Sequence, residues 1–203
     1  MPIRFAIKRA AYVGLIADGL IGGFGAAAAP KEPLTIYGLK FPDRIAGAER
    51  GEAHDFEKAN PGFGHSVQYA IPAWSINVYI YDMGRTSIPD DPQSELVKGQ
   101  LEDARREVFQ VRSKVEWKRD FSIHGEGKKV RFVCGAFAFA DKPSEPRDSF
   151  VCLTAWKNKF VKFRLTTPPR SGSEAEATRF VRAWTGVLWP SRAPAARQQS
   201  ASP

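Results

Sequence analysis

The chain has 203 residues, of which 43% are hydrophobic and 26% are charged, and this composition excludes a wholly disordered protein. Its length is enough to bury a core without metals or several disulfides. The net charge of +8 and the pI of about 9.6 indicate either an anionic partner or simple solubility, and the choice depends on where the protein is located.

Residues 1–29 have the features of a secretory signal peptide. Basic residues precede a short apolar run, and the small residues Ala26–Ala29 allow cleavage, at a point that the sequence leaves open. The alternatives are an uncleaved anchor or an element of the domain, but Asp18 and several glycines make a poor membrane-spanning helix. We therefore expect a periplasmic or secreted protein that meets no nucleic acid and is not integral to the membrane after cleavage.

Apolar alternation predicts strands in the first half of the chain. Leu34–Leu39 and Glu52–Lys58 are weak candidates, and the turn residues Asn60–Gly64 lead into two clear strands, His65–Ile71 and Trp74–Tyr81. In the last of these the alternation is strict, which predicts one face in the core and one face at least half exposed to water.

A long amphipathic helix is predicted from Pro92 to about Arg112. Asp91 has the form of an N-cap, and Pro92 suits the first helical position. The apolar stripe recurs at spacings of three and four residues: Val97, Leu101, Ala104, Val108 and Val111.

Four further strands follow. Val115–Ile123 alternates, and Lys128–Ala140, Phe150–Trp156 and Phe160–Leu165 form a predicted antiparallel meander. The first two strands of the meander are apolar on both faces, which predicts positions in the middle of the sheet. The third strand alternates, so we expect it nearer an edge or with one open face.

The C-terminal part combines a helix with a polar tail. Ser173–Glu176 has the form of a capping box, and an apolar helical stripe continues until Pro190 stops it. Residues 191–203 are predicted to be disordered. The chain is thus expected to hold one α+β domain over residues 30–190. That domain is an antiparallel sheet of about six to eight strands, with the long middle helix and the C-terminal helix packed on it.

Cys134 and Cys152 are the only cysteines, and an even count in an oxidising compartment indicates a disulfide. If the loop Asp141–Ser149 closes symmetrically, however, Cys134 faces Trp156, four residues from Cys152. Disulfide geometry is strict, so a bonded pair and two buried free thiols both remain open.

No motif for chemistry stands out. His54, His65 and His124 lack the spacing of metal ligands, and no Gly-x-Ser-x-Gly nucleophile motif occurs. We therefore predict no catalytic, cofactor-binding or metal-binding residues. A site assembled from residues distant in sequence would leave no local motif.

One surface feature is a candidate for binding. Lys157, Lys159, Lys162 and Arg164 fall on a turn and on the predicted outward face of the third meander strand. Such a basic patch suits an anionic envelope surface or an acidic envelope protein. The alternative is that these charges only deter edge-to-edge aggregation.

Two resemblances add to this reading. Tyr79–Asp91, Arg147–Trp156 and Lys159–Leu165 resemble segments of uncharacterised exported proteins of Gram-negative bacteria, over most of the mature chain. That resemblance implies export and no particular activity. The order of elements, above all the strand -KFVKFRLT- followed by an amphipathic helix, is similar to the PsbP-like fold. This second resemblance implies an accessory, assembly or interaction role.

The leading hypothesis is a non-catalytic periplasmic accessory or interaction protein. A flat sheet face with exposed Tyr79 and Tyr81 would favour it. The alternatives are an envelope hydrolase and a small-ligand carrier with a pocket lined by Trp74, Trp117 or Trp184.

Overall fold

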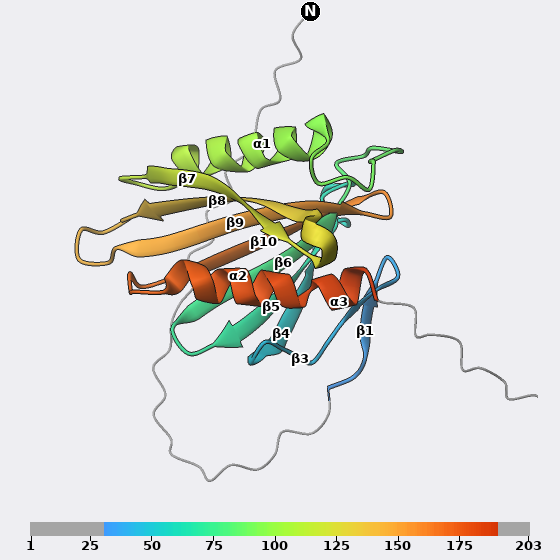
Figure 1. The fold of residues 1–203 in the computed structure, drawn as a ribbon, viewed down its shortest axis with the longest axis horizontal. Coiled ribbons are helices and arrows are strands. Elements are labelled where there is room, and N and C mark those ends of the chain that lie inside the picture. The colour runs from blue at the N-terminus through green and yellow to red at the C-terminus, as the bar shows by residue number, and fades with distance from the viewer. Residues whose placement is uncertain (1–30, 191–203) are drawn as a thin grey trace, which may run out of the picture. The chain divides into compact units, whose positions relative to one another are not determined.

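The computed structural model describes residues 31–190, so the predicted signal peptide (1–29) and the predicted tail (191–203) lie outside the described residues. The described part holds a small ribbon of β1 and β2 and an antiparallel sheet of eight strands (Figure 1). The order of strands in the large sheet is β3-β4-β5-β6-β10-β9-β8-β7.

The strands follow the predicted alternation closely in the middle of the chain and less closely at its start. Their bounds are β1 Leu34–Ile36, β2 Leu39–Phe41, β3 Arg44–Ile45, β4 Ala48–Asp55, β5 His65–Ile71, β6 Trp74–Tyr81, β7 Glu116–His124, β8 Val130–Phe139, β9 Arg147–Trp156 and β10 Lys159–Thr167. The helices are α1 Glu95–Val111, α2 Ser173–Ala183 and α3 Thr185–Leu188, with a short 3-10 turn at Glu126–Lys128.

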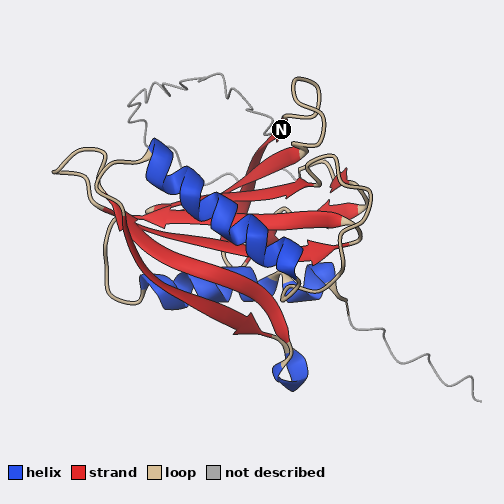
Figure 2. Cartoon of the chain, turned by 90° about the horizontal axis from the view of Figure 1, so that it is seen from above, coloured by secondary structure: helices blue, strands red, loops and turns tan. Residues whose placement is uncertain are grey.

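The helices cover opposite faces of the sheet, and each face has its own core (Figures 1 and 2). On one face, Phe180 of α2 and the wholly buried Trp184 pack their rings edge-on against Tyr69 of β5. On the other face, α1 packs on β8 and β9 with four residues of its predicted stripe buried, whereas the fifth, Val111, is exposed. The structure therefore confirms the predicted α+β class, with a middle helix and a C-terminal helix packed on an antiparallel sheet.

We predicted the third meander strand, β10, nearer an edge or with one open face, and the structure does not place it near an edge. It lies inside the sheet, where Phe163 faces Cys152 of β9 on one side and Val78 of β6 on the other. The N-terminal strands join the sheet through β6, so the edges fall at β3 and β7.

The register that a symmetric Asp141–Ser149 loop would give the cysteines is not the one in the structure. Cys134 of β8 lies directly opposite Cys152 of β9, and the structure joins them by a disulfide with a Cα–Cα distance of 4.1 Å. The pairing of β8 with β9 extends to Phe139 opposite Arg147. The connecting loop therefore ends before Arg147, and not at Ser149 as we assumed.

Both helices begin differently from the prediction. α1 starts at Glu95 with Ser94 as its N-cap, because the Asp91 carboxylate caps a turn ahead of the helix by accepting from Gln93 N–H at 2.9 Å. α2 has Gly172 as its N-cap, so the predicted capping box is wrong. The Ser173 hydroxyl instead donates to Asp148 of β9 at 3.1 Å, which ties α2 to the sheet.

Candidate functional site

The structure divides the predicted basic patch into two places. Lys157 and Lys159 lie at the turn between β9 and β10, whereas Lys162 and Arg164 lie further along β10 on the face that carries α1. Lys157 is exposed, Lys159 is paired with Asp82, and the other two side chains are largely buried. The four residues therefore do not form one open surface.

The alternation of β10 explains where Lys162 and Arg164 point. Its odd-numbered residues, such as Phe163, enter the core under α2, so the even-numbered residues face the side of α1. On that side the in-register neighbours on β6 are Tyr79 opposite Lys162 and Asn77 opposite Arg164. A basic strand face is thus enclosed between two other strands and lies beside a helix.

Lys162 is held among aromatic rings and one carboxylate. Its Nζ lies 4.8 Å from the ring centroid of Tyr79, 5.5 Å from that of Tyr81 and 4.0 Å from Glu107 Oε2 of α1. Burial lowers the pKa of Lys162, with a further lowering by the neighbouring Arg164 cation and an opposing effect of Glu107.

Arg164 has no such partner. Its Nη2 is buried and makes no hydrogen bond. The two carboxylates that influence it are already engaged, since Glu107 lies next to Lys162 and Asp141 accepts from Arg112 at 2.6 Å. Burial accordingly lowers the pKa of Arg164. A guanidinium nitrogen that is buried without a hydrogen-bond partner costs free energy, and an anion that accepts from it would remove that cost.

The sheet next to Arg164 is open. α1 packs chiefly on β8 and β9, and it also reaches β6 at Tyr81. Gln68 and Ser75 are exposed on β5 and β6, and Asn77 and Tyr79 are half-buried. An exposed pair of Tyr79 and Tyr81 would have favoured an interaction role, but Tyr81 is buried and donates through its hydroxyl to Gln100 of α1 at 3.1 Å.

Tyr79 differs from Tyr81 because it borders this open surface. Burial raises the pKa of Tyr79, while the Arg164 cation opposes the rise, so the phenol stays protonated at neutral pH. Lys162, Arg164, Tyr79 and the Asn77 amide therefore bring hydrogen-bond donors together at one place, and we call these four residues the β6–β10 donor group. Such a set matches the oxygens of a carboxylate or a phosphate.

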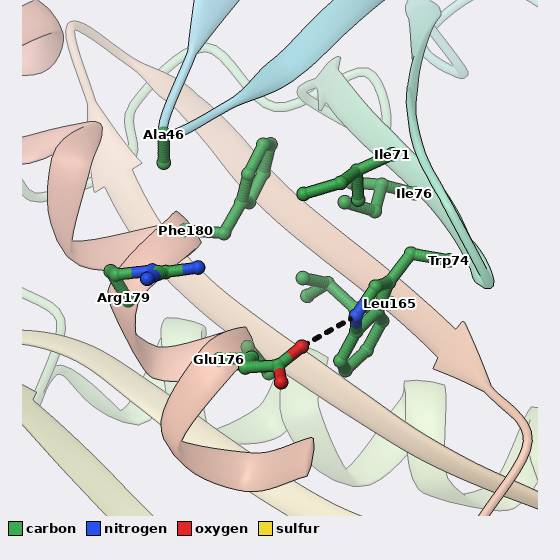
Figure 3. Close-up of a pocket in the computed structure, with 9 residues that line it drawn as sticks. Ala46, Ile71, Trp74, Ile76, Leu165, Glu176, Arg179 and Phe180 are labelled. Carbon is green, nitrogen blue, oxygen red and sulfur yellow. Dashed lines mark hydrogen bonds between the residues drawn. The ribbon is translucent and has the colours of Figure 1, made fainter. Parts of the chain in front are cut away.

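The tryptophans do not line a ligand-sized pocket. The cavity beside Trp74 has a volume of about 20 Å³, which is room for about one water molecule (Figure 3). The Trp74 indole donates to Glu176 of α2 at 2.9 Å. Trp184 is wholly buried, and Trp117 stacks on Phe137 with 5.5 Å between centroids.

A larger hollow of about 380 Å³ lies between α1 and strands β7 and β8. Two of its charged side chains are already partnered. Lys98 pairs with Glu95 at 3.0 Å, and Asp120 accepts from Trp117 Nε1 at 2.8 Å. It therefore offers fewer free groups to a ligand than the β6–β10 donor group does.

The histidines lie apart from both places. His65 Nδ1 is 3.7 Å from Asp55 Oδ1 at the start of β5, and His124 is exposed at the end of β7. Within residues 31–190, no three side chains of the His, Cys, Asp and Glu types gather closely enough to hold a metal ion. The helices of that part are also too short or too polar to cross a bilayer.

No family model and no curated protein matches the chain. Among solved structures, it is similar to the cyanobacterial PsbP protein (CyanoP) of Synechocystis, with 16% identity, a TM-score of 0.47, and coverage of 81% of this chain and 96% of that one.

Two other solved structures are similar to the chain at lower scores. A protein of unknown function from Pseudomonas aeruginosa has 11% identity and a TM-score of 0.40, over 80% of this chain and 96% of that one. The Ran-binding protein Mog1p of Saccharomyces cerevisiae has 11% identity and a TM-score of 0.37, over 77% and 91%. Membership of an exported Gram-negative family stays a prediction.

Proposed function

We propose that this chain is a non-catalytic binding protein whose ligand places an anionic group against Arg164 on the open side of the sheet. The observation that carries the proposal is the buried, unpartnered Nη2 of Arg164, beside carboxylates that are engaged elsewhere. An anion there would remove the free-energy cost of an unpaired guanidinium. Two oxygens of the anion would accept the two parallel N–H bonds of the planar guanidinium group.

Binding fits this site better than catalysis because all four side chains of the β6–β10 donor group can donate hydrogen bonds. Lys162 is next to Glu107, and Tyr79 stays a neutral phenol, so neither is set up to take a proton from a substrate. General acid–base catalysis instead needs a group whose pKa lies near the working pH and within reach of the transferred proton. The donor group therefore orients an anion and leaves its bonds intact.

We further propose that the protein acts in the periplasm or another exported compartment, after cleavage of residues 1–29. The composition of that segment supports export, and the Cys134–Cys152 pair suits an oxidising compartment. N-terminal sequencing of the protein from its native host tests this proposal. A first residue near Pro30 is expected, and a protein that begins at Met1 would contradict it.

The anion site is tested by NMR on the ¹⁵N-labelled protein, through the Nε–Hε signal of Arg164. The probes are a glutamate-only hexapeptide and inorganic phosphate, added separately so that a carboxylate and a phosphate are distinguished. We expect a saturable shift of the Arg164 signal with at least one probe. We also expect affinity at least tenfold weaker in R164Q, which corresponds to about 1.4 kcal/mol; in that variant the titration is followed through the backbone amide signals of β6, because the Arg164 side-chain signal is absent.

The matched control is R182Q, which removes an exposed arginine of α2 on the opposite side of the sheet. It should leave the titration unchanged. An Arg164 signal that moves with neither probe, or equal losses in R164Q and R182Q, would show that only general positive charge is sensed and would end the proposal.

A further inference from the structure

Four turns meet at one end of the sheet. The registers His65–Ile80 and Phe160–Tyr81 bring the ends of β4, β5, β6, β9 and β10 together. The turn between β1 and β2 joins them, because the Tyr37 ring lies 5.3 Å from that of His65. We call the surface formed by residues 37–38, 56–64, 82–86 and 157–158 the loop face.

The loop face exposes large apolar side chains. Tyr37 is 41% exposed, Phe63 is 50% and Met83 is 47%. Within the described residues, only Phe109 and Val111 at the end of α1 share this property. Three such side chains on three separate loops at one end of a sheet indicate an interaction surface.

These loops are fixed, so the exposure is not that of a loose segment. The Glu57 carboxylate accepts from Gly62 N–H at 2.9 Å and from Gly64 N–H at 2.8 Å, and Met83 N–H donates to the Gly62 carbonyl at 2.7 Å. A Cβ at Gly62 would lie 2.4 Å from the backbone nitrogen of Gly84, so the two loops touch without room for a side chain.

The backbone at this end is also strained. Tyr37 and Met83 have φ values of 50° and 56°, in the left-handed region that side-chain-bearing residues rarely adopt. Strain of this kind persists where the surroundings hold it, and it concentrates at functional sites. Here it accompanies two of the three exposed apolar side chains.

The acidic and basic side chains of the loop face differ in their exposure to solvent. Its acids are engaged within the protein: Glu57 by the glycine amides, and Asp82 by Lys159 and by Gly84 N–H at 2.7 Å. The exposed charged residues of the four segments are cations, namely Lys58, Arg85 and Lys157, and of these Lys58 lies 3.6 Å from Asp55 Oδ2. The outermost layer of the loop face is thus apolar and cationic together.

We propose that the loop face binds the surface of an anionic phospholipid bilayer. Phe63, Met83 and Tyr37 enter the headgroup region, and the exposed cations lie at the level of the phosphates. This contact is independent of the anion site at Arg164, which lies on the face of the sheet. It leaves that site free to bind a ligand at the membrane surface.

Vesicle sedimentation tests the proposal. The protein is purified after export and processing, and the vesicles contain either phosphatidylcholine alone or phosphatidylcholine mixed with phosphatidylglycerol. We expect binding to the mixed vesicles only, with weakening as salt rises. The double variant F63S/M83S should lose at least tenfold in partition coefficient, and K157Q about fivefold.

Phe109 gives the matched control, because it is 49% exposed on α1, outside the loop face. F109S and R164Q should both bind vesicles as the wild type does, and R164Q separates this proposal from the anion site. Equal binding to both vesicle types, no binding, or an equal loss in F109S would overturn the proposal. A dimer in solution that F63S/M83S dissociates, without vesicle binding, would show a protein interface instead.

Discussion

Replacing Arg164 by methionine should stabilise the protein while it removes anion binding. Arg164 lies inside the sheet between Asn77 and Val151, and methionine keeps an unbranched stem of similar length in that place. What is lost is the guanidinium, whose Nη2 is buried without a partner. Most substitutions of half-buried residues destabilise, so a gain would set this position apart.

The size of the gain follows from the neighbours. A buried donor without a partner costs about 1–3 kcal/mol. The attraction of Glu107 and Asp141 for Arg164 is offset by repulsion from Lys162 and Arg112, so little favourable electrostatic energy is lost with the charge. We therefore expect R164M to raise the free energy of unfolding by about 1 kcal/mol, and Tm by roughly 2–4 °C.

Urea unfolding followed by tryptophan fluorescence measures the change, with R182M as the exposed control that should stay within about 0.5 kcal/mol of the wild type. A saturating anion adds a second test. The glutamate hexapeptide at tenfold its Kd should stabilise the wild type by about 1.4 kcal/mol and leave R164M unchanged. If R164M instead loses about 1 kcal/mol or more, Arg164 is a structural residue and the reasoning fails.

Three further predictions concern the scaffold. Changing Cys134 and Cys152 together to alanine should lower the free energy of unfolding by about 3 kcal/mol, because the disulfide closes a loop with a sequence separation of 18. A urea titration that shows a loss under about 1 kcal/mol would contradict this. G135A should lower the free energy of unfolding by about 1–3 kcal/mol and change the fluorescence of Trp117, because a Cβ at position 135 would lie 2.0 Å from the Trp117 indole. Unchanged fluorescence would contradict this close packing. The N–H groups of Gly62 and Gly64 lower the pKa of Glu57, so the stability that this carboxylate gives to the loop is complete above pH 4.5 and is lost as pH falls through the lowered pKa. Amide exchange at these two glycines should therefore be faster in that pH range, and in E57Q it should be faster at every pH.

The sequence determined the local features because they depend on periodicity. Strict alternation placed the strand Trp74–Tyr81 with both bounds correct, and the apolar stripe placed α1 to within a few residues. The number and type of elements also sufficed for the α+β class. Alternation further assigned Lys162 and Arg164 to one face of β10 and Phe163 to the other, as the structure has them.

Only the tertiary structure decided what covers each face. A period of two says which side chains share a face, but it contains no information about the strand or helix that lies next to it. The pairing of β10 with β6 joins segments about eighty residues apart, and it encloses the predicted surface cations between strands. The same limit applies to Cys134 and Cys152, whose opposition depends on the length of a loop that the residue pattern does not define.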